Sequence, residues 1–224
     1  MTGEDWAAIR LSVQVATCAV LAGLPLAVGL GYALARLPAA ARGAVETLVN
    51  LPLVLPPVVT GYLLLVLLGR NGPIGSTLER WMGVRLVFTW QGAALASAVM
   101  AFPLMVRAAR LAFQSVDGRL ELAARGLGAG RLDAFFTVAL PLAWRGVIAG
   151  GVLGFARSLG EFGATIVLAG NIAGETRTIP LAVYSQMHRR EGMEQAWPLV
   201  AVSIVLAIAS LAIGEFLERA QELR

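Results

Sequence analysis

Long stretches without a charged residue are the feature that most constrains this chain. Asp, Glu, Lys and Arg are absent from four of them, at 11–35, 47–69, 86–106 and 195–214. A fifth stretch, 146–174, is interrupted only by Arg157 and Glu161. Because roughly 20 apolar residues cross the hydrocarbon core of a bilayer, each stretch is long enough for one crossing. We predict an all-α polytopic membrane protein, a single domain over residues 1–224, with transmembrane helices at about 11–35, 47–69, 86–106, 146–170 and 195–214.

Composition excludes several classes of protein. Charged residues make up 14% of the chain, hydrophobic residues 58%, and the mean hydropathy is +0.74, values that exclude a soluble domain and a disordered one. All 18 basic residues are Arg, and without Lys the chain lacks the lysine of an ATP-binding P-loop. One His and one Cys allow neither a zinc cluster nor a disulfide. The net charge of +4 is explained by Arg in loops, so we expect no nucleic-acid partner.

The N-terminus carries Glu4 and Asp5 where a secretory signal would be basic, so we expect the first apolar stretch to be retained as a helix. Five crossings place the two termini on opposite sides. Ten Arg lie on the side of the 36–46 loop, the 107–145 loop and the C-terminal tail, against seven on the other side. By the positive-inside rule the N-terminus is predicted outside and the C-terminus in the cytoplasm.

The second stretch contains Pro52, Pro56 and Pro57. Each proline lacks a backbone donor and blocks the carbonyl one turn earlier, so this helix must be kinked or unwound. A broken helix is tolerated at membrane depth where protein or a water-filled cavity satisfies the freed carbonyls. Two interpretations stay open, a packing kink and a break that lines a transport pathway or gate.

Arg157, Ser158 and Glu161 lie together in the fourth predicted helix, and the two charges are four residues apart on one face. A charge at the bilayer centre costs on the order of 3 kcal/mol, so both side chains must face protein or water. They form either a structural ion pair or a pathway lining between two subunits, where the Arg157 guanidinium would favour a dianion.

The loop between the third and fourth predicted helices contains a short amphipathic helix at 115–131. Ser115 or Asp117 can cap it, and Glu121 is expected to pair with Arg125 at i,i+4. One face carries Leu120, Ala123, Ala124 and Leu127, and glycines follow at 126, 128 and 130. Such a helix is too short to be stable alone in water. It either fits a groove on another protein or lies on lipid headgroups.

This loop resembles the EAA loop of permease subunits in ATP-binding cassette (ABC) importers. The family pattern is Glu-Ala-Ala, three residues, Gly, nine residues, Ile, one residue, Leu-Pro. The chain departs from it at Leu122, since the carboxylate stands one position earlier, and Val138 takes the place of Ile. The resemblance implies a cytoplasmic loop at about 113–141 that docks into an ATPase subunit through Asp117, Glu121, Ala123, Ala124, Gly128, Leu140 and Pro141.

Segments 50–59, 97–110, 156–165 and 174–180 resemble molybdate permease subunits, and sulfate and tungstate permeases share looser versions of these patterns. The resemblance implies a type I ABC importer permease fold in the cell inner membrane. It also implies a homodimer that binds two copies of an ABC ATPase subunit and receives molybdate from a periplasmic or surface binding protein. The ATPase partner would bind ATP, so the chain itself would need no cofactor, metal or catalytic residue.

Other functions stay open at this point. The transported anion could be tungstate, sulfate or thiosulfate. An ion-coupled secondary transporter would usually show an inverted repeat, and the sequence shows no internal repeat. A membrane-embedded enzyme would need a polar cluster within its helices, and Arg157 and Glu161 are the charged residues available.

Overall fold

The computed structural model describes residues 1–189 and 192–222, and this part of the chain is helical and holds no strand. In chain order its helices are α1 (Gly3–Arg36), α2 (Ala39–Val54), α3 (Pro57–Leu68), α4 (Pro73–Met82), α5 (Trp90–Gln114), α6 (Gly118–Gly126), α7 (Arg131–Ala134), the π-helix η1 (Phe135–Ala139), α8 (Leu140–Leu159), α9 (Gly163–Leu168), α10 (Ile179–Met187) and α11 (Gly192–Glu222).

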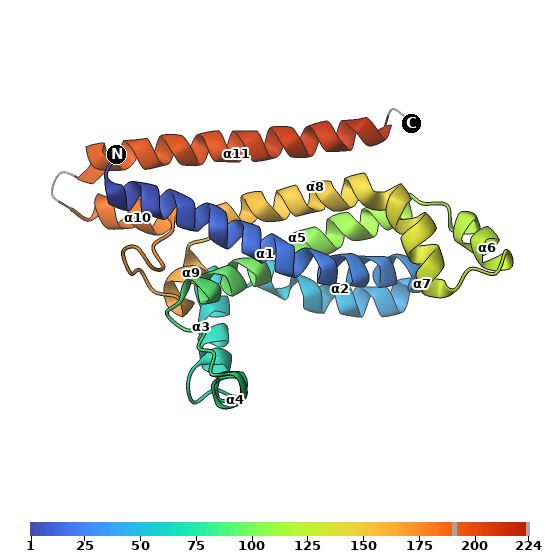
Figure 1. Cartoon of the computed structure of the whole chain (residues 1–224), viewed down its shortest axis with the longest axis horizontal. Coiled ribbons are helices and arrows are strands. Elements are labelled where there is room, and N and C mark those ends of the chain that lie inside the picture. Colours follow the sequence, from blue (N-terminus) through green and yellow to red (C-terminus); the bar gives the residue numbers. More distant parts are fainter. Residues whose placement is uncertain (190–191, 223–224) are drawn as a thin grey trace.

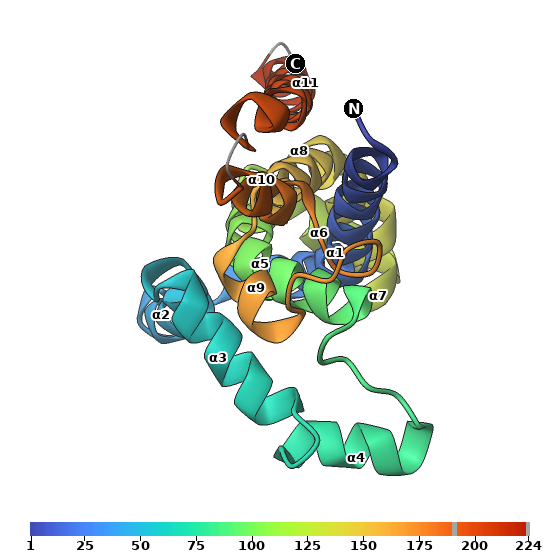
Figure 2. The same ribbon diagram turned by 90° about the vertical axis from the view of Figure 1, so that its left-hand side faces the viewer.

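A bundle of α1, α5 and α8 forms the centre of the molecule, and α11 lies along α8 (Figures 1 and 2). The buried residues of this bundle are mostly alanine and glycine. A Cβ added at Gly31 would lie 2.7 Å from the Cβ of Ala109, and one at Gly150 would lie 2.6 Å from that of Ala108. These small residues therefore let the helix backbones approach closely, as is common between helices in membranes.

The prolines of the second apolar stretch break the helix, as predicted. The chain bends by 106° between α2 and α3, and the break falls at Leu55 and Pro56. Pro57 starts α3, where its missing N–H costs nothing because the first helical amides have no partner. Beyond the break α3 leaves the bundle and carries α4 away from it (Figures 1 and 2).

By length and composition, four helical segments among the described residues are apolar enough to cross a membrane, or five if the bent pair α2–α3 is one span. The four are Gly3–Arg36, Trp90–Gln114, Arg131–Leu159 and Glu194–Leu217. The all-α, polytopic class predicted from the sequence is therefore confirmed.

The helices do not coincide with the predicted ranges. Helix α1 begins earlier, at Gly3, α11 runs on to Glu222, and the third and fourth are shifted. The third was predicted at 86–106, but α5 begins at Trp90, where the Thr89 hydroxyl accepts from the Gly92 amide at 3.2 Å, and it runs on to Gln114. The fourth was predicted at 146–170, but α7, η1 and α8 form one helical segment that ends at Leu159. Residues 163–168 form a separate short helix, α9, because the chain breaks at Gly160 to Phe162.

The helix ends gather at two ends of the bundle. The start of α1 lies beside α10 at one end, whereas α6 lies toward the other end, where α11 also finishes (Figure 1). The first and last helices therefore start and finish at opposite ends of the bundle, as an odd number of membrane crossings requires. The direction of the bundle across the membrane stays a prediction.

Candidate functional site

Helix α6 occupies the middle of the loop that the sequence singled out. Asp117 caps it, its carboxylate accepting from the Arg119 amide at 2.9 Å. Gly128 lies just beyond the C-terminus with φ of +101°. Side chains other than glycine rarely adopt that conformation, so the glycine is needed for the turn from α6 into α7.

The outer face of α6 is apolar and open. Leu127 is 92% exposed, Leu120 and Leu122 are also exposed, and Ala123 lies on the same open surface. Leu132 and Phe136 extend this apolar surface onto α7 and η1. Exposed leucines around a small-residue helix favour contact with another protein over contact with water.

The inner face of α6 is held by Glu121, which is 9% exposed. The hydroxyl of Tyr32 donates to Oε2 at 2.7 Å, and Nη2 of Arg36 forms an ion pair with Oε1. Glu121 therefore contacts α1, and the predicted pair with Arg125 is not the contact that it makes. Tyr32 and Arg36 were not predicted as site residues, although their i,i+4 spacing at the end of α1 puts a polar pair on one helix face.

The end of the predicted loop is continuous with the next helix. Leu140 and Pro141 form the first turn of α8, directly after η1. A proline inside a helix removes one hydrogen bond and its ring presses on the carbonyl four residues earlier. The wider π-turn of Phe135–Ala139 relieves this conflict, which is why the helix continues through Pro141.

The structure brings the prolines at the α2–α3 break close to the segment that follows Arg157, Ser158 and Glu161. A Cβ added at Gly163 would lie 2.8 Å from Cβ of Pro57, and one at Gly61 would lie 2.8 Å from Cα of Ala164. The start of α3 therefore packs directly on α9. Pro52 lies one turn before the break, within α2, and Pro56 caps α3.

Arg157 and Glu161 form an ion pair with 2.7 Å between Nη1 and Oε2. The Glu161 side chain is 2% exposed, whereas that of Arg157 is 27% exposed. The other carboxylate oxygen of Glu161 accepts from the Ala164 amide at 2.9 Å, so this side chain joins the end of α8 to the start of α9. Ser158 is buried, and its hydroxyl has no hydrogen-bond partner among the described residues.

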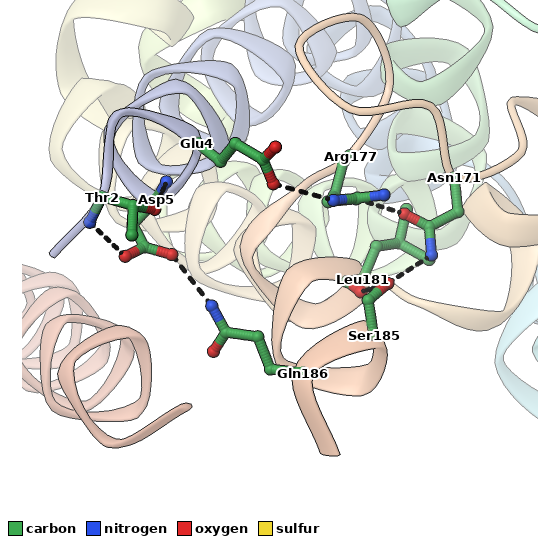
Figure 3. A network of polar contacts seen from close by, with 8 residues as sticks. All are labelled: Thr2, Glu4, Asp5, Asn171, Arg177, Leu181, Ser185 and Gln186. Atoms are coloured by element: carbon green, nitrogen blue, oxygen red, sulfur yellow. Dashed lines mark hydrogen bonds and ion pairs between the residues drawn. The ribbon is translucent and has the colours of Figure 1, made fainter. Parts of the chain in front are cut away.

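A polar network that the sequence did not predict ties the start of α1 to the 171–177 loop and α10 (Figure 3). Arg177 bridges Glu4 of α1 at 3.3 Å and the Asn171 side-chain oxygen at 2.9 Å. Asp5 accepts from Gln186 of α10 at 2.9 Å and completes a capping box with Thr2. Sequence patterns within one helix predict the cap of α1, but they do not predict the contacts of Glu4 and Asp5 with residues far along the chain.

Among the described residues, no group of three or more His, Cys, Asp or Glu side chains is placed to hold a metal ion.

Comparison with known proteins identifies the family. Residues 23–222 match the family described as "Binding-protein-dependent transport system inner membrane component". The chain belongs to this family. The molybdenum transport system permease protein ModB of Escherichia coli K12 is 52% identical over 219 residues, covering 98% of this chain and 96% of that protein. ModB of Haemophilus influenzae is also 52% identical and covers 95% of this chain and 93% of that protein.

Solved structures place this permease in the type I ABC importer fold. A bacterial alginate ABC transporter, solved with an alginate-bound periplasmic protein, aligns with a TM-score of 0.68 at 20% identity, over 97% of this chain and 78% of that one. The inward-facing MetNI methionine ABC transporter aligns with a TM-score of 0.64 at 17% identity, over 97% of this chain and 99% of that one. At these identities the likeness shows the fold.

Proposed function

We propose that this permease is the membrane-spanning subunit of an ATP-driven importer of molybdate in the cell inner membrane. The observation that carries the proposal is the 52% identity to ModB of two bacteria over nearly the whole chain. A periplasmic or surface binding protein supplies the anion, and a separate ABC ATPase subunit binds and hydrolyses ATP. The chain itself carries no ATPase site, since the sequence holds no Lys for a P-loop.

Helix α6 is the contact with the ATPase subunit. Support comes from its open apolar face and from the sequence pattern Ala123, Ala124, Gly128 that the loop shares with the EAA family. ATP binding draws two ATPase subunits together, and the attached α6 helices follow. This movement switches the permease between inward-facing and outward-facing states, a two-state change biased by a ligand on another chain.

The transporting unit is a homodimer that binds two ATPase subunits. Helices α2 and α3 support this, because α3 leaves the bundle and the two helices carry many exposed apolar side chains: Leu51, Leu53, Val54, Val58, Val59, Tyr62, Leu63 and Val66. A second copy packed on this side would enclose a path between the two chains. The broken helix at Pro56 and the Arg157–Glu161 pair then lie near that path and form its gate.

Uptake by purified protein tests the substrate. The permease and its ATPase subunit are reconstituted in liposomes with the cognate binding protein and ATP, and labelled molybdate uptake is measured against excess tungstate or sulfate. We expect uptake that requires ATP and the ATPase subunit, with competition by unlabelled molybdate stronger than by sulfate. Uptake driven by an ion gradient without ATP would instead indicate a secondary transporter, and preferred uptake of sulfate would reassign the substrate.

A further inference from the structure

We propose that Tyr32, Arg36 and Glu121 form the joint through which movement of α6 is transmitted to α1, so that Glu121 acts inside the permease and not on the ATPase surface. This inference rests on the proposed function, in which α6 moves with the ATPase subunit. It assigns a positioning role to two residues of α1 that lie outside the loop.

Both carboxylate oxygens of Glu121 have partners within the permease. One carboxylate oxygen accepts from the Tyr32 hydroxyl at 2.7 Å, and the other forms the ion pair with Arg36. The Glu121 side chain is 12% exposed and that of Arg36 is 33% exposed. Hydrogen bonds that involve a charged group are shorter and stronger than neutral ones, and partial burial strengthens them further.

Leu120 and Leu127 of α6 are exposed, and the Asp117 carboxylate is used to cap α6 itself. A groove of about 630 Å³ runs between α6 and α1, and Leu122, Arg125 and Leu132 line it together with the joint residues. Because a groove separates the two helices beside the joint, the contacts of Glu121 hold α6 in place across it.

The two joint residues of α1, Tyr32 and Arg36, pack against other helices of the bundle. The Tyr32 ring lies edge-on against Phe113 of α5 and Phe135 of η1, with ring centroids 5.2 Å and 4.8 Å apart, and the Arg36 guanidinium lies 5.6 Å from the Tyr32 ring centroid. Edge-to-face aromatic pairs of this kind add to the energy of burial. A displacement of Glu121 therefore acts on α1, α5 and the start of the α8 segment together.

Helix α1 extends the joint to the opposite end of the molecule. It is one helix of 34 residues, about 50 Å long at 1.5 Å per residue. Its first turn is bound to Arg177 and Gln186 by the network of Figure 3. The Ser12 hydroxyl adds a further bond from the same helix, accepting from the Ile179 amide at 2.7 Å. A tilt of α1 that starts at Arg36 therefore also moves the loop and helix at residues 171–187.

The test is performed on the reconstituted complex of permease and ATPase subunit. The variants are Glu121→Gln, Arg36→Gln, Tyr32→Phe, the double Arg36→Gln/Glu121→Gln, and the exchanged pair Arg36→Glu/Glu121→Arg. Arg85→Gln is the matched control, because it breaks another arginine–glutamate ion pair, which joins Glu79 of α4 to the exposed Arg85 just beyond that helix. Co-purification of the ATPase subunit and ATP hydrolysed per anion imported are measured for each.

We expect every joint variant to keep its ATPase subunit. Glu121→Gln and Arg36→Gln should raise the ATP hydrolysed per anion about tenfold, since a hydrogen bond to a charged group contributes at least that much. The double variant should be no worse than either single one, and the exchanged pair should recover part of the coupling. If Glu121→Gln releases the ATPase subunit, or if Arg36→Gln couples normally, Glu121 acts on the ATPase and the joint is refuted.

A distance measurement separates this inference from the substrate assignment, because it needs no transported anion. Spin labels are placed at Gly3 and Arg119 in a Cys18→Ala background; both positions are exposed, and a side chain at Gly3 meets no atom within 4 Å. If the joint holds, ATP leaves the distance between the labels unchanged in the otherwise native chain and changes it in Glu121→Gln. An ATP-dependent change in the native chain itself contradicts the joint, even if molybdate proves not to be the substrate.

Discussion

At the scale of single residues, the Glu161 side chain between α8 and α9 is almost fully buried. One of its carboxylate oxygens pairs with Arg157 and the other accepts from the Ala164 amide. Arg157→Met leaves this carboxylate buried without its ion pair, a change that typically costs about 3–5 kcal/mol. Glu161→Gln keeps an acceptor for the Ala164 amide but leaves the Arg157 charge unpaired. We expect both single variants to lower the yield of dimer in mild detergent, and the double variant Arg157→Met/Glu161→Gln to restore it.

Transport by the same variants distinguishes a structural pair from a pathway lining. If the pair also lines the path, the double variant should assemble normally and recover only part of the ATP-driven molybdate uptake. Full recovery of uptake would exclude the pathway role, and unimpaired assembly of both single variants would exclude the structural one.

Gly128 permits a second prediction at this scale. Its φ of +101° is strained for any other residue, whereas Gly130 has φ of −67° and open space around it. We expect Gly128→Ala to destabilise the α6–α7 turn by about 1–2 kcal/mol and to weaken uptake, and Gly128→Asp to abolish coupling while the protein still inserts. Gly130→Ala, the matched control, should behave as the native chain. Equal uptake and ATPase stimulation in Gly128→Asp and the control would contradict a role in coupling.

How far the sequence predicts these residues depends on how distant their partners are. The Asp117 cap and the glycine turn are local features, and local patterns predicted them. Glu121 instead binds Tyr32, which is 89 positions away. An i,i+4 rule cannot reveal such a contact, because it depends on how α1 and α6 meet in space. The roles proposed for the other loop residues, Ala123, Ala124, Leu140 and Pro141, stay predictions.

At the scale of elements, charge-free stretches indicate how many apolar segments there are but not where helices end. Capping side chains and paired charges set the ends. Helix α1 begins at Gly3 because Thr2 and Asp5 cap it, and α5 runs on through Arg110, which pairs with Glu46 of α2 at 2.9 Å. The fourth span was predicted as one continuous range, 146–170, whereas Gly160 and the carboxylate of Glu161 separate α8 from α9 within this apolar sequence.

Helix α3 allows a test of the proposed dimer. Leu63 on α3 is 47% exposed in the single chain and Leu211 on α11 is 57% exposed, so the two positions are comparable. If a second copy covers α3, a spin label at Leu63 in reconstituted permease should be less accessible to dissolved oxygen than one at Leu211. Equal or higher accessibility at Leu63 would show that lipid covers α3 and that the dimer uses another face.

At the scale of the whole molecule, the arrangement of helix ends constrains the topology without fixing its direction. The start of α1 and the 171–177 loop are bound together by Arg177, so they must lie on the same side of the membrane. Helix α6 lies toward the opposite end of the bundle (Figure 1). The excess of arginine in the loops on the α6 side and the resemblance of this loop to the EAA family both predict that α6 lies in the cytoplasm. Reversing the molecule would separate α6 from any cytoplasmic ATPase.

Cysteine labelling tests this direction. Single cysteines are introduced at Gly3, Ala173 and Gly130 in a Cys18→Ala background, all three positions being exposed in the structure. Thr178, although on the same loop as Ala173, is unsuitable because its side chain is only 4% exposed. In intact spheroplasts a membrane-impermeant maleimide should label positions 3 and 173, and it should reach position 130 only after permeabilisation. Labelling of position 130 from outside, with positions 3 and 173 protected, would reverse the topology and remove α6 from the compartment in which the ATPase subunit binds ATP.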